Sequence, residues 1–129
     1  MESTYAQSVT QEENPPENSL DNDFDTRFAG STPNYIVYDI GEKKTVDKAV
    51  IAFYSGMRRK TIFSIEVSVD GEEWTRVFDG ESSGITDRYE YFDLGGSEAR
   101  YIKINGYGTS TNEDWLSVLE FRVFAKKTI

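Results

Sequence analysis

The stretch Phe63-Ser64-Ile65-Glu66-Val67-Ser68-Val69, followed by Asp70-Gly71, decides the fold class of this chain. Apolar and polar residues alternate along it, so one face of an extended strand would be buried and the other would face solvent. The Asp-Gly pair that follows is a common turn signal between two strands. The stretch therefore predicts a half-buried β-strand that ends in a turn.

Further strands are predicted on both sides of this stretch. β-branched and aromatic residues gather in short runs, Gly- and Ser-containing loops separate them, and no run has helical spacing. The other expected strands are Ser8–Thr10, Tyr35–Ile40 (ended by Gly41), Asp47–Tyr54, Trp74–Phe78, Tyr89–Leu94, Tyr101–Asn105 and Leu116–Phe124. Together they predict an all-β domain, an eight-stranded antiparallel β-sandwich of the jelly-roll type.

The length of 129 residues fits one domain with a single core. Residues 1–7 are expected to form a flexible N-terminal segment, residues 8–125 the sandwich, and residues 126–129 a C-terminal tail. Pro15-Pro16 lies in a polar stretch and resists both helix and central strand.

Composition narrows the range of functions. The net charge of -9 argues against nucleic acid or an anionic membrane as the main partner, because both require a basic surface. The sequence has no cysteine, so no disulfide is expected. It also has no apolar run of membrane-spanning length. The polar start, Met1-Glu2-Ser3-Thr4, does not resemble a signal peptide.

A second informative stretch is the acidic loop Asn18-Ser19-Leu20-Asp21-Asn22-Asp23-Phe24-Asp25-Thr26-Arg27-Phe28. Its carboxylates at alternate positions offer hard oxygen atoms of the kind that Ca²⁺ binds in sets of about six to eight. The loop is not an EF-hand, because it lacks that motif's glycine and closing glutamate. A solvated acidic turn is the alternative interpretation, since aspartates are common in loops.

The usual catalytic groups are missing. There is no histidine for general-base chemistry, no cysteine nucleophile and no recognisable phosphate-binding loop. Pairs of carboxylates do not indicate a glycosidase here, because with 23 acidic residues some pairs will lie at glycosidase distances by chance. The remaining catalytic alternative is a lyase that uses tyrosine and arginine. We expect a protein that is not an enzyme.

The order of these motifs resembles the discoidin, or coagulation-factor type C (F5/8 type C), family. The likeness is carried by the acidic loop and by four further segments: Tyr35–Gly41, Ile65–Trp74, Ala99–Ile104 and Ser117–Phe124. The chain lacks the cysteine pair of many animal members, and so is most similar to the bacterial family-32-type carbohydrate-binding modules attached to glycoside hydrolases and polysaccharide lyases. The resemblance implies a galactose-binding-domain-like jelly roll with a structural Ca²⁺ ion.

The resemblance also implies a set of metal ligands. Side chains of Asp21, Thr26 and Glu120 would bind the ion, together with carbonyl groups of Asn18, Asp23 and Thr26 and with the Asp23 carboxylate as a further candidate. The chain departs from the family pattern at Asn22, where glycine is common, and at Phe28, where tryptophan is common. Neither departure removes an oxygen ligand, and asparagine tolerates a left-handed backbone.

Two loops have the chemistry of a ligand site. The segment Tyr54–Lys60 holds the only dense basic cluster, and Tyr107–Trp115 combines polar hydrogen-bonding groups with aromatic edges. Sugars require an aromatic ring against the pyranose and directional hydrogen bonds to the hydroxyls, and arginine adds bidentate recognition of a carboxylate. The expected ligand residues are Arg27, Tyr54, Arg58, Arg59, Lys60, Tyr107, Asn112 and Trp115.

Two stretches that overlap these loops, Phe53–Arg59 and Gly106–Asn112, resemble those of modules that accompany lyases of uronate polysaccharides such as alginate. The simpler interpretation of Arg58-Arg59-Lys60 is a solvated basic turn that balances nearby carboxylates. Core packing is the simpler role for Phe63, Trp74, Phe78, Phe92, Tyr101 and Phe121.

The sequence therefore predicts a non-catalytic module that targets an attached enzyme to a polysaccharide, with an anionic uronate polymer such as alginate as the expected ligand. The expected partners are that polysaccharide and a catalytic domain in the same parent chain. We expect a monomer that is secreted or displayed at the cell surface. The alternatives are a discoidin-type adhesion module for protein or lipid, and a structural scaffold domain of a larger enzyme.

Overall fold

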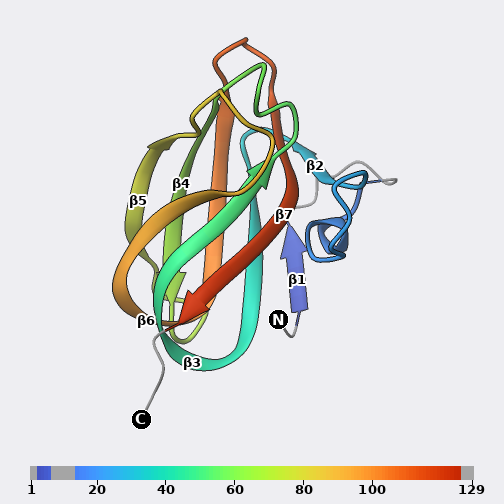
Figure 1. Ribbon diagram of the computed structural model, residues 1–129. Helices are drawn as coiled ribbons and strands as arrows, with labels where there is room; N and C mark the ends of the chain where they lie inside the picture. The colour runs from blue at the N-terminus through green and yellow to red at the C-terminus, as the bar shows by residue number, and fades with distance from the viewer. Residues whose placement is uncertain (1–2, 7–13, 126–129) are drawn as a thin grey trace.

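The computed structural model describes residues 3–6 and 14–125, and Figure 1 shows their arrangement. These residues form seven strands and one short 3-10 helix, so the all-β prediction is confirmed and the predicted number of strands, eight, is wrong. The strands are β1 (Ser3–Ala6), β2 (Phe28–Ser31), β3 (Asn34–Phe53), β4 (Thr61–Ser68), β5 (Thr75–Glu81), β6 (Glu90–Thr109) and β7 (Trp115–Ala125), and the helix is η1 (Pro16–Ser19).

Predicted and observed strands differ in three ways: two pairs of predicted strands are merged, β1 and β2 were not predicted as strands, and the predicted strand 8–10 lies outside the described residues. The predicted strands 35–40 and 47–54 are parts of one strand, β3, and the predicted strands 89–94 and 101–105 are both parts of β6. Gly41 does not end the first of them; it adopts a φ of 94° inside β3, where the pairing register with β6 shifts between Asp39 and Lys44. A glycine can take this backbone conformation without strain, so the strand bends and continues.

The bends fold one antiparallel sheet into two layers. In the first, which we call the β7 layer, the second half of β3 pairs with β7 and with the start of β6, and β2 pairs with the other edge of β7. In the second, the β4 layer, the first half of β3 pairs with β1 and with the end of β6, which pairs in turn with β4, and β4 with β5. Figure 1 shows the two layers face to face.

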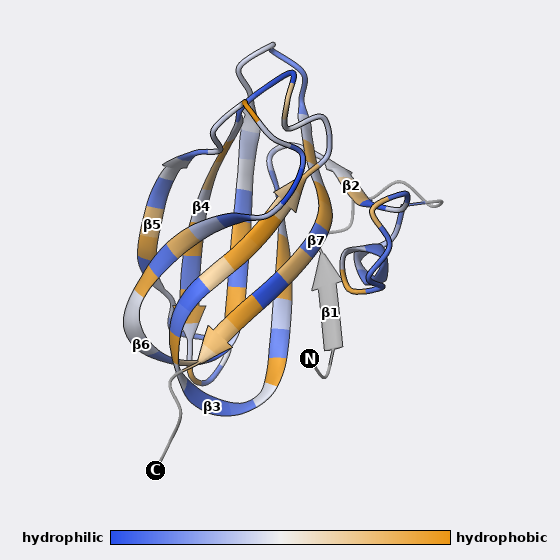
Figure 2. Cartoon of the chain, viewed as in Figure 1, coloured by the Kyte–Doolittle hydropathy of each residue, from blue (hydrophilic) through white to orange (hydrophobic). Residues whose placement is uncertain are grey.

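The core lies between the layers. Along the strands hydrophobic and hydrophilic residues alternate (Figure 2), and the inward residues include a cluster of phenylalanine rings. Phe63 contacts Phe53, Phe78 and Phe92 with ring centroids 5.0–5.1 Å apart. Phe63, Phe92 and Phe121 are buried as predicted and Phe78 packs on the core, but Trp74 and Tyr101 are half-buried outside it.

The N-terminal segment differs from its prediction. Residues 3–6, expected to be flexible, form β1, and the predicted strand 8–10 and the predicted tail 126–129 lie outside the described residues. Pro16 begins η1 rather than preventing a helix, because a first-turn residue needs no N–H donor. The described part of the chain contains no helix long and apolar enough to cross a membrane.

Candidate functional site

The acidic loop lies between η1 and β2, at the side of the sandwich next to β7 (Figure 1). One buried contact holds η1 in place: Ser19 Oγ donates to the carbonyl oxygen of Pro16 at 2.7 Å and is hydrogen-bonded to Tyr38 Oη at 2.8 Å. Tyr38 in turn stacks on Phe121 of β7, with ring centroids 3.8 Å apart. The start of the acidic loop is thereby fixed to both layers of the sandwich.

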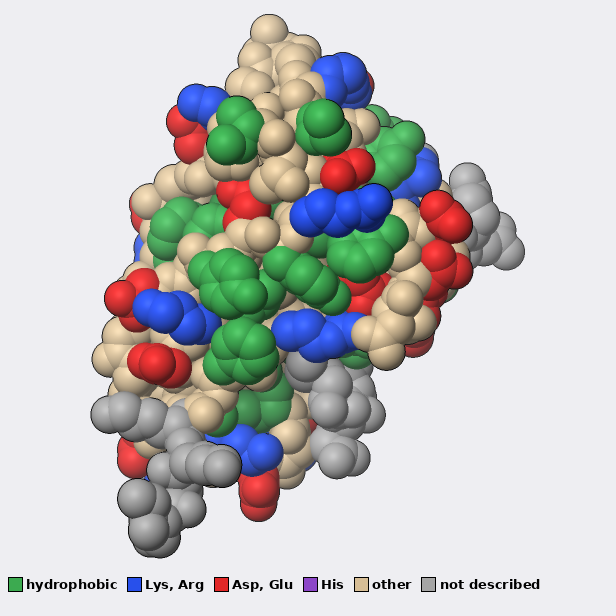
Figure 3. Space-filling view, in the orientation of Figure 1, with side chains coloured by type: hydrophobic (Ala, Val, Ile, Leu, Met, Phe, Trp, Pro, Cys, Tyr) green, Lys and Arg blue, Asp and Glu red, His purple; other side chains and the backbone are tan. Residues whose placement is uncertain are grey.

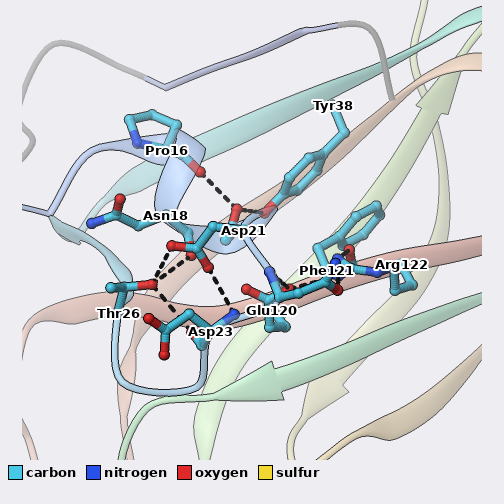
Figure 4. Close-up of polar contacts among 11 residues, drawn as sticks. Pro16, Asn18, Asp21, Asp23, Thr26, Tyr38, Glu120, Phe121 and Arg122 are labelled. Carbon is cyan, nitrogen blue, oxygen red and sulfur yellow. Dashed lines mark hydrogen bonds and ion pairs between the residues drawn. The ribbon is translucent and has the colours of Figure 1, made fainter.

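Oxygen atoms converge at the centre of this loop (Figure 4). Thr26 Oγ1 is hydrogen-bonded to a carboxylate oxygen of Asp21, and it lies 3.1 Å from the carbonyl oxygen of Asp23 and 3.4 Å from that of Asn18. The loop keeps this shape through its own turns, because Asp23 N–H donates to Asp21 Oδ1 and Asn22 adopts a φ of 59°. The left-handed backbone expected at Asn22 is confirmed.

Glu120 reaches the same place from β7. Its side chain is fully buried, and its Oε1 accepts hydrogen bonds from Asn22 N–H at 3.1 Å and from Arg122 Nη2 at 2.8 Å. Its other oxygen, Oε2, is also buried and has no hydrogen-bond partner among the described residues. A buried carboxylate oxygen without a donor is costly, so it is the kind of group that a cation would satisfy.

The two carboxyl groups of this cluster shift in opposite directions. Partial burial alone would raise the pKa of Asp21, but the hydrogen bond from Thr26 and the neighbouring Glu120 outweigh it, and the pKa is lowered. Burial, and then the neighbouring Asp21, raise the pKa of Glu120. Two carboxylates held together in this way favour a positive charge between them.

The donor set therefore fits a hard cation. No group of three His, Cys, Asp or Glu side chains suited to a metal occurs among residues 14–125, but this cluster relies on two carboxylates, one hydroxyl and backbone carbonyl oxygens, which Ca²⁺ accepts and softer metals do not favour. The predicted ligand residues Asn18, Asp21, Asp23, Thr26 and Glu120 all lie here. Calcium itself remains a prediction.

A hollow of about 330 Å³ opens beside the acidic loop, at the end of the sandwich where the β3–β4 and β6–β7 loops meet. Five of the eight predicted ligand residues line it, together with four that were not predicted. The predicted ones are Arg27, Tyr54, Arg58, Arg59 and Trp115, and the others are Ala29, Ser55, Glu113 and Ser117. We refer to it as the arginine hollow.

The turn after β3 points two of these arginines toward the hollow. Tyr54 N–H donates to the carbonyl oxygen of Ser117, which fixes the end of β3 against β7. Ser55 then takes a left-handed φ of 56°, and its carbonyl oxygen accepts hydrogen bonds from the N–H groups of Arg58 and Arg59. Only glycine fits at position 56, because a Cβ atom there would lie 2.1 Å from the carbonyl oxygen of Thr86.

Glu113 of the β6–β7 loop holds both arginines. Its carboxylate lies 2.9 Å from Arg58 Nη2 and 3.3 Å from Arg59 Nη1, and its backbone is held on both sides by Thr109 Oγ1. Hydrogen bonding from Thr111, with that from Arg58 and Arg59, lowers the pKa of Glu113 to about 2. The carboxylate is thus ionised at any ordinary pH and keeps the two guanidinium groups in place.

Arginines also flank the aromatic ring of the hollow. The guanidinium carbon of Arg27 lies 4.0 Å from the ring centroid of Tyr54, and that of Arg59 lies 5.9 Å from it. The Nε atoms of both arginines are buried without a hydrogen-bond partner among the described residues. Three arginines against one glutamate leave the arginine hollow with an excess of positive charge in an acidic protein.

Three predicted ligand residues lie elsewhere. Lys60 points to Glu81, with Nζ 3.5 Å from Oε1. Tyr107 lies on the outer face of the β4 layer, where its hydroxyl is hydrogen-bonded to Ser64 Oγ and accepts from Arg76 Nη2. Asn112 is exposed in the β6–β7 loop, where its φ of 61° shapes a turn. These three do not line the arginine hollow.

Sequence reasoning missed Glu113 as a member of the site. Glu113 lies two positions before Trp115, inside the loop that was singled out, but its pairing with Arg58, 55 residues away, and with Arg59 has no local sequence signal. Ala29 and Ser117 enter the hollow because β2 pairs with β7 at these two positions, which only the strand pairing reveals.

Comparison with known proteins gives a consistent result. The F5/8 type C domain family matches residues 3–121. The CBM32 of AlyQ, solved in complex with 4,5-unsaturated mannuronic acid, is 35% identical with a TM-score of 0.91, and the match covers 96% of this chain and 95% of that one. A search of curated proteins found no match.

Two further solved structures extend the comparison. A truncated AlyQ that contains CBM32 and alginate lyase domains is 33% identical with a TM-score of 0.91; the match covers 99% of this chain but only 33% of that longer one. A pectin-binding carbohydrate-binding module is 25% identical with a TM-score of 0.89, with 98% of this chain and 92% of that one covered. Both match the jelly-roll architecture described above.

Proposed function

We propose a ligand for this chain, which belongs to the F5/8 type C domain family and is a non-catalytic carbohydrate-binding module of the CBM32 type. In this proposal, the arginine hollow binds a uronate unit of an anionic polysaccharide such as alginate. The observation that carries the proposal is the convergence of Arg27, Arg58 and Arg59 in one hollow, with Arg27 and Arg59 against the ring of Tyr54. The carboxylate of the sugar would accept charge-assisted hydrogen bonds from these guanidinium groups.

The other residues of the hollow provide what a sugar ring needs. Tyr54 is 38% exposed and Trp115 is half-buried, so both aromatic side chains offer surface for the apolar face of a pyranose. Ser55 and Ser117 add hydroxyl groups at the wall of the hollow. Glu113 holds Arg58 and Arg59 before the ligand arrives, which lowers the entropy that binding costs.

The solved relatives support this ligand class. The AlyQ module was solved in complex with 4,5-unsaturated mannuronic acid, and the less similar module is a pectin-binding one. In AlyQ a module of this kind shares its chain with an alginate lyase domain. By this reasoning the module serves an enzyme that degrades polysaccharide outside the cell, and holds that enzyme near its substrate.

The acidic loop would hold a structural Ca²⁺ ion through Asn18, Asp21, Asp23, Thr26 and Glu120. When bound, the ion would supply positive charge to two crowded carboxylates and an acceptor-rich loop. Arg27 belongs to the same loop and lines the arginine hollow, so an ordered loop also fixes one of the ligand arginines.

Calorimetric titration with a uronate disaccharide and with a neutral galactose disaccharide tests the proposal. We expect micromolar to millimolar affinity for the uronate, and a loss of about 10- to 100-fold in Arg58→Ala and Arg59→Ala, because each removes a charge-assisted hydrogen bond worth about 1.5–3 kcal/mol. Arg76→Ala, on the β4 layer, is the matched control and should bind normally. Preference for the neutral sugar, with no effect of Arg58→Ala, would refute the proposal.

A further inference from the structure

A strip of aromatic side chains crosses the outer face of the β7 layer. It consists of Phe24 from the acidic loop, Tyr89 directly before β6, Tyr91 at the start of β6, and Phe124 near the end of β7. Tyr91 is 65% exposed, Phe124 52% and Tyr89 36%. Figure 3 views this face and shows hydrophobic side chains gathered over the layer, with basic and acidic side chains among them. We call this surface the aromatic strip.

Strand pairing places these rings and the basic side chains on the same face. Val50 of β3 pairs with Tyr91 on one side and with Arg122 on the other. Lys48 pairs with Asp93 and with Phe124. Paired residues of neighbouring strands point to the same side of a sheet, so these side chains share the outer surface. The rings of Tyr91 and Phe124 lie side by side, with centroids 6.4 Å apart and planes inclined by 35°.

The aromatic strip continues from the arginine hollow. Phe24 meets Tyr89 edge to face at 5.4 Å, and the guanidinium carbon of Arg88 lies 4.7 Å from the Phe24 ring. Phe24 shares the acidic loop with Arg27, which lies over Tyr54 in the arginine hollow. From Tyr54, β3 runs beneath the strip to Lys48, about 20 Å along the strand at roughly 3.4 Å per residue. That length accommodates several sugar units.

Lys48 and Arg88, two of the basic side chains along the strip, remain available to a ligand. The closest approach of Lys48 to Asp93 is 3.7 Å and that of Arg88 to Asp87 is 4.0 Å, and all four side chains are at least 41% exposed. Exposed pairs at such distances contribute little to stability, so a carboxylate of another molecule can compete for the cations. Rings that alternate with cations suit a polymer with pyranose faces and one carboxylate per unit.

We infer that the aromatic strip binds the further sugar units of a uronate polysaccharide of which one unit occupies the arginine hollow. The inference rests on the proposed function, and it makes the ligand site an extended surface rather than a single pocket. A protein partner would favour a continuous apolar patch, whereas the exposed cations of Arg88 and Lys48 interrupt this one. A polyanionic chain is complementary to that pattern.

Titration of the protein with a uronate disaccharide and a uronate hexasaccharide tests the inference. We expect the hexasaccharide to bind the unmodified protein at least about tenfold more tightly, and the double variant Tyr91→Ala/Phe124→Ala to lose that gain while its disaccharide affinity stays the same. Val69→Ala, an exposed apolar residue after β4 that lies outside the strip, is the matched control. Both variants should melt near the temperature of the unmodified protein, because the altered side chains are exposed.

Three results would overturn the inference. The first is equal affinity of the unmodified protein for both oligosaccharides. The second is an equal loss for both oligosaccharides in the double variant. The third is a dimer, seen by sedimentation, that the double variant dissociates, because the strip would then be a contact between two copies of the chain. Absence of binding to either oligosaccharide would refute the proposed function as well, whereas disaccharide binding without a gain in length refutes only the aromatic strip.

Discussion

Replacing Glu120 with glutamine separates a calcium clamp from an ordinary acidic turn. Glu120→Gln keeps the volume of the side chain and an oxygen that can accept from Asn22 N–H, but it removes the negative charge of a fully buried ligand. The proposed ligand set has only two carboxylates in close contact, Asp21 and Glu120, so the substitution removes about half of its charge. We expect the protein to lose most of its stabilisation by calcium.

The size of the effect follows from linkage. A ligand at about 100 times its Kd stabilises the folded state by about 2.7 kcal/mol. For 129 residues, at about 2.1 cal/mol/K per residue, the entropy of unfolding is about 0.27 kcal/mol/K, so calcium should raise Tm by about 10 °C. If the lost charge weakens binding about 100-fold, the same calcium concentration contributes only about 0.4 kcal/mol, or about 1.5 °C.

Thermal melts with calcium and with a chelator measure this difference for each variant. The calcium-dependent increment is the diagnostic quantity, because Glu120→Gln also removes the partner of Arg122 and so changes Tm without metal. Glu72→Gln, an exposed carboxylate beyond β4, is the control and should keep the full increment. An unchanged increment in Glu120→Gln, or no increment in the unmodified protein, would show that the acidic loop is not a calcium site.

Three further predictions concern stability. Tyr38→Phe removes the buried hydrogen bond to Ser19 and should cost about 1 kcal/mol, or about 4 °C in Tm; an unchanged melt would mean that η1 is not held by this contact. Gly56→Ala brings a Cβ atom to 2.1 Å from the carbonyl oxygen of Thr86, so we expect it to lower the free energy of unfolding, measured in urea, by about 1–3 kcal/mol and to weaken uronate binding. An unchanged free energy of unfolding and unchanged uronate affinity would contradict the turn geometry. Hydrogen bonding from Arg100 lowers the pKa of Asp39 below its usual 3.8, so the stabilisation from this pair is complete above about pH 4 and is lost as the pH falls through the lower folded-state pKa. Asp39→Asn should therefore flatten the fall in unfolding free energy between about pH 4 and pH 2, and an identical slope in both proteins would contradict this role.

The strands were predictable because their signal is local. The alternation in 63–69 depends only on neighbouring residues, and β4 is found there, at Thr61–Ser68. The joining of 35–40 to 47–54 was not predictable, because it depends on how Gly41 is used: the same residue can end a strand or bend it. The sequence therefore indicated most of the strands, but it divided two long strands into four and did not reveal β1 and β2.

The candidate site was predictable in part for the same reason. Tyr54, Arg58, Arg59 and Trp115 lie in two loops whose composition suggested a ligand site, and the structure brings them together with Arg27. Lys60 and Tyr107 belong to those stretches too, but Lys60 directly precedes β4 and Tyr107 lies within β6, where strand geometry turns their side chains elsewhere. Side-chain direction within a short turn depends on backbone angles such as the φ of Ser55, which composition does not reveal.

The position of β7 between β2 and β3 has a consequence for how this domain forms. Residue 28 pairs with residue 118 and residue 53 also pairs with residue 118, so the β7 layer closes only when chain segments far apart in sequence meet. Domains dominated by such distant pairings fold slowly, in milliseconds to seconds. During synthesis, Arg27 and Tyr54 would emerge well before Trp115 and Ser117, so the arginine hollow cannot capture a sugar until the last strand has left the ribosome and entered the sheet.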